Sequence, residues 1–492
     1  MKVLSIKNIL LGLAVTAVAL PGCKKFLDVN DNPNDLKNAD ISLVLPSAEA
    51  AIAHVVGNNF QVYGGIWAQY WTQFWLSSQY KTIDQYQPVA SDFDRGWGIL
   101  YNDALTDLNY IISQPATAKN NQYRAIAFIL RAYTFQLLTD AFGDIPLKDA
   151  TKGQSGNLSP AYDPQQEVYD SIFTYIDQGI AILDADSDFP PGAADLIFGD
   201  SDDQMGDWLR FANTLKLRAY LRISLKDEGK ATAGINALYA TTPEFLEEDA
   251  QIEYTASGGN QNPLFSEILG LGRTQNLYAS ATSVDTLQKS NDPRRRVFYR
   301  NVTGFDTIVG IPQGSYDNTP SDDITDGLRS SASFRVGARG GDDNSALAPV
   351  KLISAAESYF LQAEVYTRGF RAGNAQTMFT EGIRASFASY DVAGVDEYIA
   401  TSPSAAWPAG EDAQWQAIMF QKWVAMNGSQ GFEAWTEWRR TGYPNLLQQS
   451  QASVLAAGLM PQRFLYPSTE LTRNLNFPGQ TLVEDKVWWD AN

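Results

Sequence analysis

Apolar residues recur at helical spacing in several long segments, and this pattern constrains the fold more than any other feature of the sequence. Residues 122–140 place one apolar stripe on a helical face, formed by Ile126, Ile129, Leu130, Tyr133 and Leu137. The same period runs through residues 165–184 and 207–225. Residues 355–368 and 374–388 predict a helix pair with small alanines between bulky side chains. Such alternation is typical of stacked tetratricopeptide-like hairpins, although no strict 34-residue repeat is present. We therefore predict an all-α fold with tetratricopeptide-like helix pairs as its scaffold.

Long polar stretches interrupt these helical patterns. They occupy residues 185–206, 254–281 and 301–350 and are rich in glycine, proline, asparagine and acidic residues. Irregular loops of this length are uncommon in a folded domain unless they are functional or mobile. The composition shows no break that would divide the chain, so residues 41–492 are predicted to form a single helical domain with long irregular loops.

The first residues have the pattern of a lipoprotein signal. Lys2 and Lys7 precede an apolar run from Ile9 to Leu20, and Cys23 follows a small residue. The run is too short to span a bilayer and is typical of a signal-peptide core. We predict a signal peptide over residues 1–22, lipidation of Cys23 and a polar tether over residues 23–40. We expect no later membrane-spanning segment, so that the lipid would be the only contact with the membrane.

The composition disfavours several classes of function. The chain has 37 basic and 56 acidic side chains, a formal net charge of −19, which would repel nucleic acid. His54 is the only histidine and Cys23 the only cysteine, so no metal site built from those residue types is expected. No phosphate-binding loop of the Walker type is found. We predict a protein that is not an enzyme and has no cofactor.

Calcium is the one metal that the acidic loops could hold. Residues 200–203 and 322–327 supply several carboxylates, but neither segment has the spacing of an EF-hand. Solvated acidic loops are the simpler interpretation, so we predict no metal ligand in either.

A series of short motifs resembles one family along the whole chain. In order, they are residues 140–146 (DAFGDIP), 162–165 (YDPQ), 211–218 (FANTLKLR), 291–294 (NDPR), 310–314 (GIPQG), 356–364 (AESYFLQAE), 431–444 (GFEAWTEWRRTGYP), 463–467 (RFLYP) and 488–490 (WWD). This order, after a lipoprotein signal, resembles the SusD/RagB family of outer-membrane nutrient-binding lipoproteins.

The resemblance implies a function and a partner. Members of the family capture oligosaccharides, and in some cases peptides, and pass them to a SusC-like TonB-dependent β-barrel transporter in the outer membrane. It therefore implies a SusD-like superhelix that is lipid-anchored and faces the cell exterior. Two alternatives remain at this point: a member that captures peptides, or a surface glycoside hydrolase, because paired carboxylates at a suitable separation are possible among so many acidic residues.

Most motif residues are better explained as structural braces than as ligand contacts. Asn213 and Arg218 could tie a helix to a loop, and Asp292 could brace Arg294. Pairs between Glu433 or Glu437 and Arg440 are within reach on one helix.

Aromatic residues interleaved with glutamines make residues 60–86 the best candidate for ligand binding. Trp67, Trp71 and Trp75 recur every four residues, which predicts three indoles along one helical face. Indole rings could stack on the C–H faces of sugars while amides reach the hydroxyl groups. The alternative is that the stripe belongs to the core, which we favour for Trp67 and Trp71. The predicted contacts in this segment are Trp71, Trp75, Tyr80 and Tyr86.

A second candidate is the loop at residues 257–279. Its polar and aromatic side chains could contact an oligosaccharide, and the residues we single out are Asn260, Arg273, Asn276 and Tyr278. Trp407, in a loop between two prolines, is a weaker third candidate.

Overall fold

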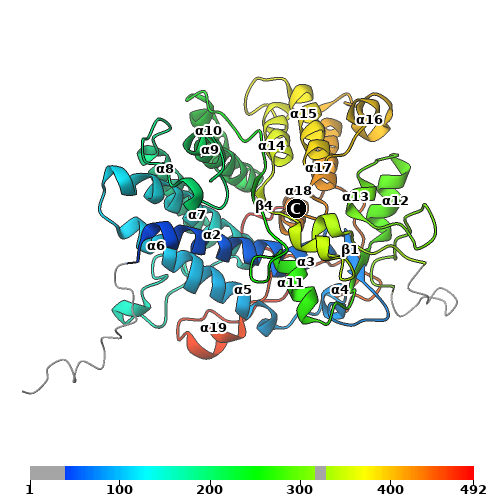
Figure 1. Ribbon diagram of the computed structural model, residues 1–492, viewed down its shortest axis with the longest axis horizontal. Helices are drawn as coiled ribbons and strands as arrows, with labels where there is room; N and C mark the ends of the chain where they lie inside the picture. Colours follow the sequence, from blue (N-terminus) through cyan, green and yellow to red (C-terminus); the bar gives the residue numbers. More distant parts are fainter. Residues whose placement is uncertain (1–38, 316–327) are drawn as a thin grey trace, which may run out of the picture. The chain divides into compact units, whose positions relative to one another are not determined.

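The computed structural model describes residues 39–315 and 328–492, which fold mainly as α-helices (Figure 1). The predicted signal peptide, Cys23, nearly all of the tether and the acidic segment 322–327 lie outside the described residues. Residues Ile41–Asn492 form one compact unit. The predicted all-α class with helix pairs and long loops is confirmed.

The helices of the first half cover residues 41–239. They are α2 (Ile41–Gly57), α3 (Asn59–Trp67), α4 (Lys81–Asp84), α5 (Asp94–Gly98), α6 (Thr106–Ser113), α7 (Ala118–Phe142), α8 (Gln165–Ile182), α9 (Gln204–Ile223) and α10 (Glu228–Tyr239). A π-helical segment, Ile99–Leu105, joins α5 to α6.

The second half has shorter helices separated by irregular chain. They are α11 (Pro263–Gly270), α12 (Ala281–Lys289), α13 (Arg295–Phe298), α14 (Ala355–Thr367), α15 (Ala375–Ala388), α16 (Val395–Thr401), α17 (Glu411–Met426), α18 (Gly431–Thr441) and α19 (Ser468–Arg473). In Figure 1, α14, α15 and α17 lie together on one side and α7 to α10 on the other.

The helices that the periodicity predicts are present, and their ends have clear local causes. Helix α7 begins after Thr117, whose side chain accepts a hydrogen bond from the amide of Asn120. It ends at Gly143, whose φ of +81° suits a residue without a Cβ. Helices α14 and α15 pack against each other so closely that a Cβ on Gly382 would lie 2.7 Å from the Phe360 ring. Small residues thus allow the close approach within this hairpin.

Two short antiparallel strand pairs accompany the helices. Strand β2 (Ala250–Ile252) pairs with β4 (Val350–Ile353), with an irregularity after Ala250. Strand β1 (Trp71–Gln73) pairs with β3 (Leu277–Ala279). Both pairs fasten segments that are far apart in the sequence.

Buried ion pairs connect the helices, and some of them follow the predicted braces. Arg440 pairs with Glu437 at 2.7 Å, as expected. Glu433, however, pairs with Arg222 of α9, because the guanidinium of Arg440 turns toward Glu364 of α14 at 2.7 Å. All five side chains are at most 10 % exposed. The expected Glu433–Arg440 pair is therefore replaced by two pairs between helices.

The other predicted braces are also structural. The side-chain amide of Asn213 donates to the carbonyl of Glu244 at 2.9 Å and so joins α9 to a loop. Arg218 donates to a glutamine of α7 and thus joins two helices. Asp292 and Arg294 form a fully buried ion pair at 2.6 Å.

Two helical segments are long and apolar enough to cross a membrane by length and composition alone, Ile41–Trp67 and Ala118–Phe142. We expected no segment after the signal peptide to be apolar enough to span a membrane, and by length and composition this expectation was wrong. The most apolar part is 56 % buried inside the protein in the first segment and 89 % in the second. Both segments therefore pack in the core of the protein, and this explains why they are so apolar.

Candidate ligand-binding surface

The β1–β3 pair brings the two predicted candidate segments together. Thr72 lies opposite Tyr278, and Gln73 lies opposite Leu277. The amide of Phe74 extends the pairing by donating to the carbonyl of Asn276 at 2.9 Å. Residues 71–80 and 273–279, which are about 200 positions apart, therefore form one local surface.

The predicted helical stripe of three tryptophans is wrong. Helix α3 ends at Trp67, and the chain reverses at Gln69, which has a φ of +60°. Trp71 then lies on β1, and its ring packs on Gly65, where a Cβ would come within 2.7 Å of it. Trp67 and Trp71 are fully buried, as the core alternative predicted. Trp75 follows in the loop after the strand.

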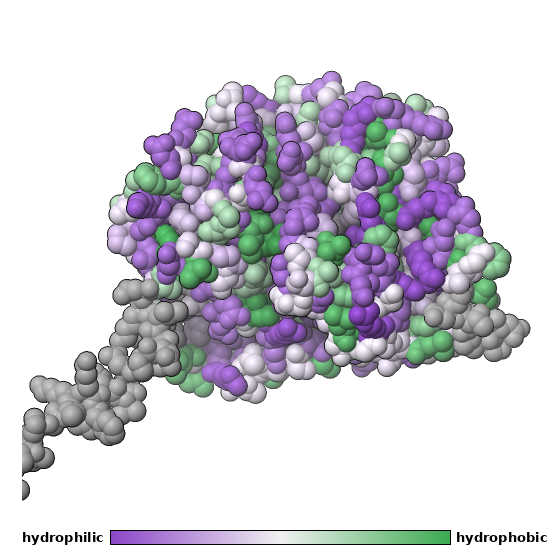
Figure 2. Space-filling view, viewed as in Figure 1, coloured by the Kyte–Doolittle hydropathy of each residue, from purple (hydrophilic) through white to green (hydrophobic). Residues whose placement is uncertain are grey.

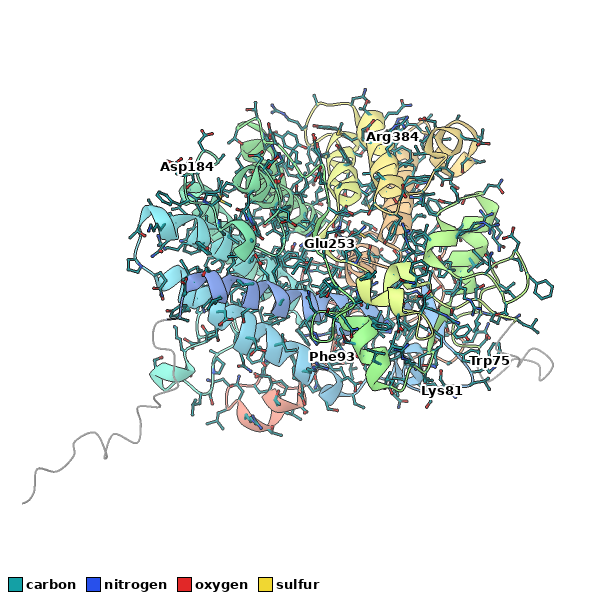
Figure 3. The ribbon with its side chains drawn as sticks, in the orientation of Figure 1. Trp75, Lys81, Phe93, Asp184, Glu253 and Arg384 are labelled. Carbon is teal, nitrogen blue, oxygen red and sulfur yellow. The ribbon has the colours of Figure 1, made fainter. Side chains whose placement is uncertain are left out.

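Trp75 is the partly exposed end of an aromatic cluster. The rings of Phe74 and Tyr278 stack with their centroids 4.0 Å apart and their planes 9° apart. The Trp75 ring lies against Phe74 at 4.9 Å. Figure 3 shows Trp75 near the edge of the protein, on the same side as Lys81. Two buried rings thus support one indole that solvent can reach.

Polar side chains fix the loop that carries Trp75. The Asn276 side-chain oxygen accepts hydrogen bonds from the amide of Gln79 and from the side chain of Gln73, both at 3.2 Å. The Gln73 side-chain oxygen accepts from the amide of Tyr80 at 2.7 Å, and the Tyr80 hydroxyl donates to Glu267 at 3.0 Å. These bonds fix the loop, and none of the four involves the indole of Trp75.

The buried carboxylate of Asp84 fixes the position of strand β1. Asp84 accepts hydrogen bonds from the amide of Gln73 and the hydroxyl of Thr72, each at 2.7 Å, and from the side chain of Gln313. Burial raises the pKa of Asp84 to about 6, which these hydrogen bonds partly oppose. Because the carboxylate is fully buried, it supports the strand and does not face a ligand.

The predicted contact residues differ in how much of each side chain is exposed. Trp71, Tyr80, Tyr86, Asn276 and Tyr278 are at most 6 % exposed and form the support behind the surface. Trp75 is only partly buried, and Leu76 beside it is 60 % exposed.

Among the remaining predicted residues, Asn260 and Arg273 are exposed and Trp407 is partly buried. Asn260 bonds to Thr255 within its own loop. Arg273 pairs with Asp343 at 2.6 Å, in an ion pair in which both side chains are exposed. Trp407 packs on Phe379 at 5.1 Å in the helical half of the core.

Sequence reasoning placed Phe74 and Gln275 within the two candidate segments but did not single out either one as a contact residue. Phe74 is one of many aromatic residues in its segment, and only the strand register reveals its stack with Tyr278. The carbonyl of Gln275 accepts a hydrogen bond from the hydroxyl of Ser77 at 3.3 Å. Neither contact has a local sequence signal.

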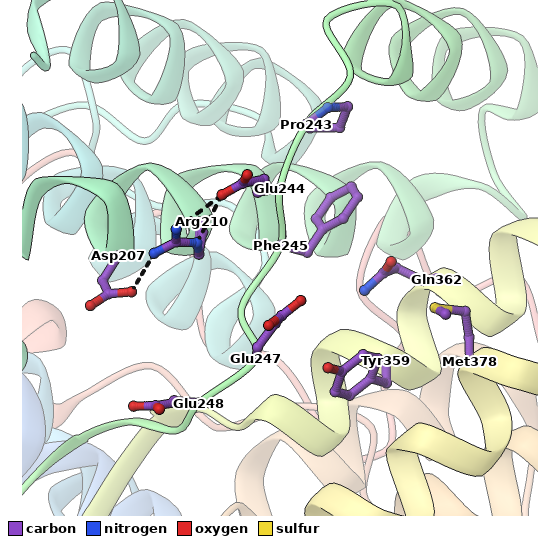
Figure 4. Close-up of a pocket in the computed structure, with 10 residues that line it drawn as sticks. All are labelled: Asp207, Arg210, Pro243, Glu244, Phe245, Glu247, Glu248, Tyr359, Gln362 and Met378. Atoms are coloured by element: carbon purple, nitrogen blue, oxygen red, sulfur yellow. Dashed lines mark hydrogen bonds and ion pairs between the residues drawn. The ribbon is translucent and has the colours of Figure 1, made fainter. Parts of the chain in front are cut away.

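A pocket of about 570 Å³ lies elsewhere, beside α9 and α14 (Figure 4). Its polar wall is mostly acidic, and Arg210 lies between Asp207 and Glu244, which it contacts at 2.7 and 3.0 Å. Tyr359 and Gln362 reach it from α14. The arginine is thus fully engaged by carboxylates, and the pocket contains none of the predicted contact residues.

The acidic loops show no arrangement for a metal ion in the part of the chain that the structure describes. Asp203 pairs with Arg210 at 2.8 Å, and Asp207 accepts from Ser201 at 2.5 Å. No group of three or more histidine, cysteine, aspartate or glutamate side chains that could hold a metal occurs within residues 39–315 and 328–492.

The protein is therefore a helical scaffold whose irregular loops carry an aromatic surface. The chain belongs to the SusD-like family described as "Starch-binding associating with outer membrane", whose match covers residues 33–467. No curated protein matches the sequence.

Solved structures of SusD homologues share the fold. A chitin-binding SusD homologue from Flavobacterium johnsoniae is 24 % identical with a TM-score of 0.74, and the match covers 91 % of this chain and 99 % of that one. A SusD homologue from Bacteroides uniformis is 24 % identical with a TM-score of 0.75, over 91 % and 99 % of the two chains. A SusD-like protein from Bacteroidetes is 23 % identical with a TM-score of 0.77, over 92 % and 100 %.

Proposed function

We propose that this protein is a cell-surface lipoprotein that captures oligosaccharides and delivers them to a SusC-like TonB-dependent transporter in the outer membrane. The observation that carries the capture role is the partly exposed indole of Trp75 on its fixed aromatic support. A rigid indole offers a large contact area at little entropic cost. The side chain of Gln79, in the same loop, is exposed and has the donors and acceptor that bind hydroxyl groups. The family description and the chitin-binding relative favour a glycan over a peptide.

The proposed capture step needs no catalytic group, cofactor or metal, because stacking and hydrogen bonding suffice for it. Asp84, which bonds to strand β1, is fully buried and accepts hydrogen bonds from three donors. We infer that the protein is a binder and not a glycoside hydrolase.

Trp75→Ala is expected to weaken oligosaccharide binding at least tenfold, because truncating a central indole typically costs about 2 kcal/mol or more. Isothermal titration with maltooligosaccharides, chitooligosaccharides and peptides would measure it, with the mixtures checked afterwards for cleavage products. Trp415→Ala is the matched control, since it removes another partly buried indole from α17, which carries none of the predicted contacts. Equal losses in both variants would contradict the proposed site, tight binding of peptides alone would favour the peptide alternative, and cleavage products would refute the binder assignment.

Cys23→Ala is expected to abolish lipid attachment and release the protein from the membrane. The expectation rests on the signal pattern before Cys23, which is the only cysteine in the chain. Metabolic labelling with a fatty acid, followed by membrane fractionation and protease treatment of intact cells, would measure attachment and orientation. Label that persists in the variant, or protection of the native protein from protease, would count against the proposed anchor or its outward orientation.

A further inference from the structure

Four arginines converge on one pocket in this otherwise acidic protein. The pocket has a volume of about 460 Å³ and lies beside α13; its lining includes Arg296, Arg300, Arg335 and Arg339 but a single acidic residue, Asp342. The whole chain carries a formal net charge of −19. A local excess of positive charge against that background is the opposite of what composition alone would place there.

Several of these guanidinium groups have neutral partners. Arg300 donates to the hydroxyl of Thr303 at 3.0 Å, and Arg335 donates to the carbonyl of Tyr390. Arg296 pairs with Asp306, but both side chains are exposed, and exposed pairs contribute little. These neutral partners do not offset the positive charges of Arg300 and Arg335, so both side chains can attract an anion. A guanidinium can bind a carboxylate or a sulfate with two parallel hydrogen bonds.

An apolar recess continues the pocket. A second cavity of about 260 Å³ shares Phe334 and Arg335 with the first and adds Leu347 and Pro349. Phe334 is 37 % exposed and Leu347 is 44 % exposed. The two cavities together offer an aromatic ring and an aliphatic wall beside the positive charges, which suits a sugar chain that bears acidic groups better than a small free ion.

One residue, Gln275, joins the arginine pocket to the loop that carries Trp75. Gln275 accepts from the amide of Gly340 and donates to the carbonyl of Ala338, each at 2.9 Å, so it holds both neighbours of Arg339. The carbonyl of the same Gln275 accepts from Ser77, in the loop that carries Trp75. The two regions are therefore parts of one connected network of loops.

We propose that the arginine pocket binds the carboxylate or sulfate groups of an acidic oligosaccharide. This inference rests on the proposed capture function and narrows its substrate class. The negatively charged body of the protein repels an acidic glycan, so capture requires a local site of opposite charge. The Trp75 surface supplies stacking that does not depend on charge, and the arginines supply the discrimination between charged and neutral chains.

The test compares charged and neutral members of matched probe pairs at low salt. The probes are tetragalacturonate with its methyl-esterified form, and sulfated maltotetraose with maltotetraose. The native protein is expected to bind at least one charged probe at least tenfold more tightly than its neutral partner. The double variant R300A/R335A is expected to lose that preference, whereas R300K/R335K keeps only part of it, because the charge is kept but the two parallel hydrogen bonds are lost. Circular dichroism would verify that both variants are folded.

Arg384→Ala is the matched control, because Arg384 is also a partly exposed arginine but lies on α15, away from Trp75 (Figure 3). It should change no affinity by more than about twofold, as expected for a surface ion pair. Equal binding of charged and neutral probes, or a preference that survives in R300A/R335A, overturns this inference and leaves the capture function standing. Binding of neither member of either pair overturns the inference, and only failure of the wider glycan and peptide panel overturns the capture function as well. A preference confined to the carboxylated or to the sulfated pair supports the inference and identifies which anion is read.

Discussion

Replacing Arg440 with methionine is expected to lower the free energy of unfolding by about 3–5 kcal/mol at neutral pH. Arg440 donates to both carboxylate oxygens of Glu364 at 2.7 Å and to those of Glu437 at 3.0 and 2.7 Å. All three side chains are buried, so the substitution leaves two carboxylates with less compensation in a region of low dielectric. Urea denaturation of the native protein and the variant at pH 7.5 would measure the loss.

The same measurement at acidic pH tests how the loss of stability in the variant changes with pH. Burial raises the pKa values of Glu364 and Glu437, but attraction to the neighbouring cations, of which Arg440 contributes most, outweighs it. The pKa of Glu364 is therefore lowered, and that of Glu437 lies well below its ordinary value. Groups with lowered pKa values add stability above their unfolded pKa of about 4.5 and lose it as the pH falls through their folded values. The difference between native protein and variant should therefore shrink as the pH falls below about 4.5.

Arg384→Ala is again a useful control, because it breaks an exposed pair with Asp396 and should cost less than about 1 kcal/mol. A loss for Arg440→Met no larger than this control value, or one that is independent of pH, would show that the buried network does not need its arginine.

Replacing Gly64 with alanine is expected to cost about 3 kcal/mol or more, because α3 and α18 cross with their backbones in contact. A Cβ on Gly64 would lie 2.2 Å from the amide nitrogen of Phe432 and 2.3 Å from the carbonyl carbon of Gly431. A Cβ on Gly431 would in turn lie 2.5 Å from the nitrogen of Gly65. Backbone atoms cannot move aside as a side-chain tip can, so the two helices would have to separate.

Gly98→Ala separates this effect from the general consequence of adding a methyl group. Gly98 is helical, and the atom nearest to its added Cβ is 3.7 Å away, in the side chain of Asn102. Alanine should be neutral or stabilising there by up to about 1 kcal/mol, because it has the higher helix propensity. Thermal and urea denaturation of both variants would measure the contrast, and similar stabilities would refute the close-crossing argument.

The parts of this fold that sequence predicts well are those with local causes. Helices α7, α14 and α15 follow from a period that a short window contains, and the caps of α7 at Thr117 and Gly143 act within a few residues. The pair between Glu437 and Arg440 has the same local origin, since one helical turn separates them.

The candidate surface has causes that no short window contains. The reversal at Gln69 places a non-glycine residue at positive φ, which composition does not signal. Strand β1 is three residues long and buried at every position, so it has no alternating pattern to reveal it. Its partner near Asn276 and the arginines of the pocket come from distant segments, so only the folded chain brings them together.

The long sequence separation across the candidate surface has a consequence for how the protein acquires its activity. Gln73 bonds to Asn276, 203 positions away, and the amide of Ser450 donates to the Tyr86 hydroxyl across 364 positions. Closing such large loops is slow and entropically costly, so local helices form before the surface can be assembled. A chain that emerges unfolded is therefore expected to complete this region only after the segment around Ser450 has docked. The ability to bind ligand then indicates that folding is complete. A truncated copy of the chain could not compete with the complete protein for ligand.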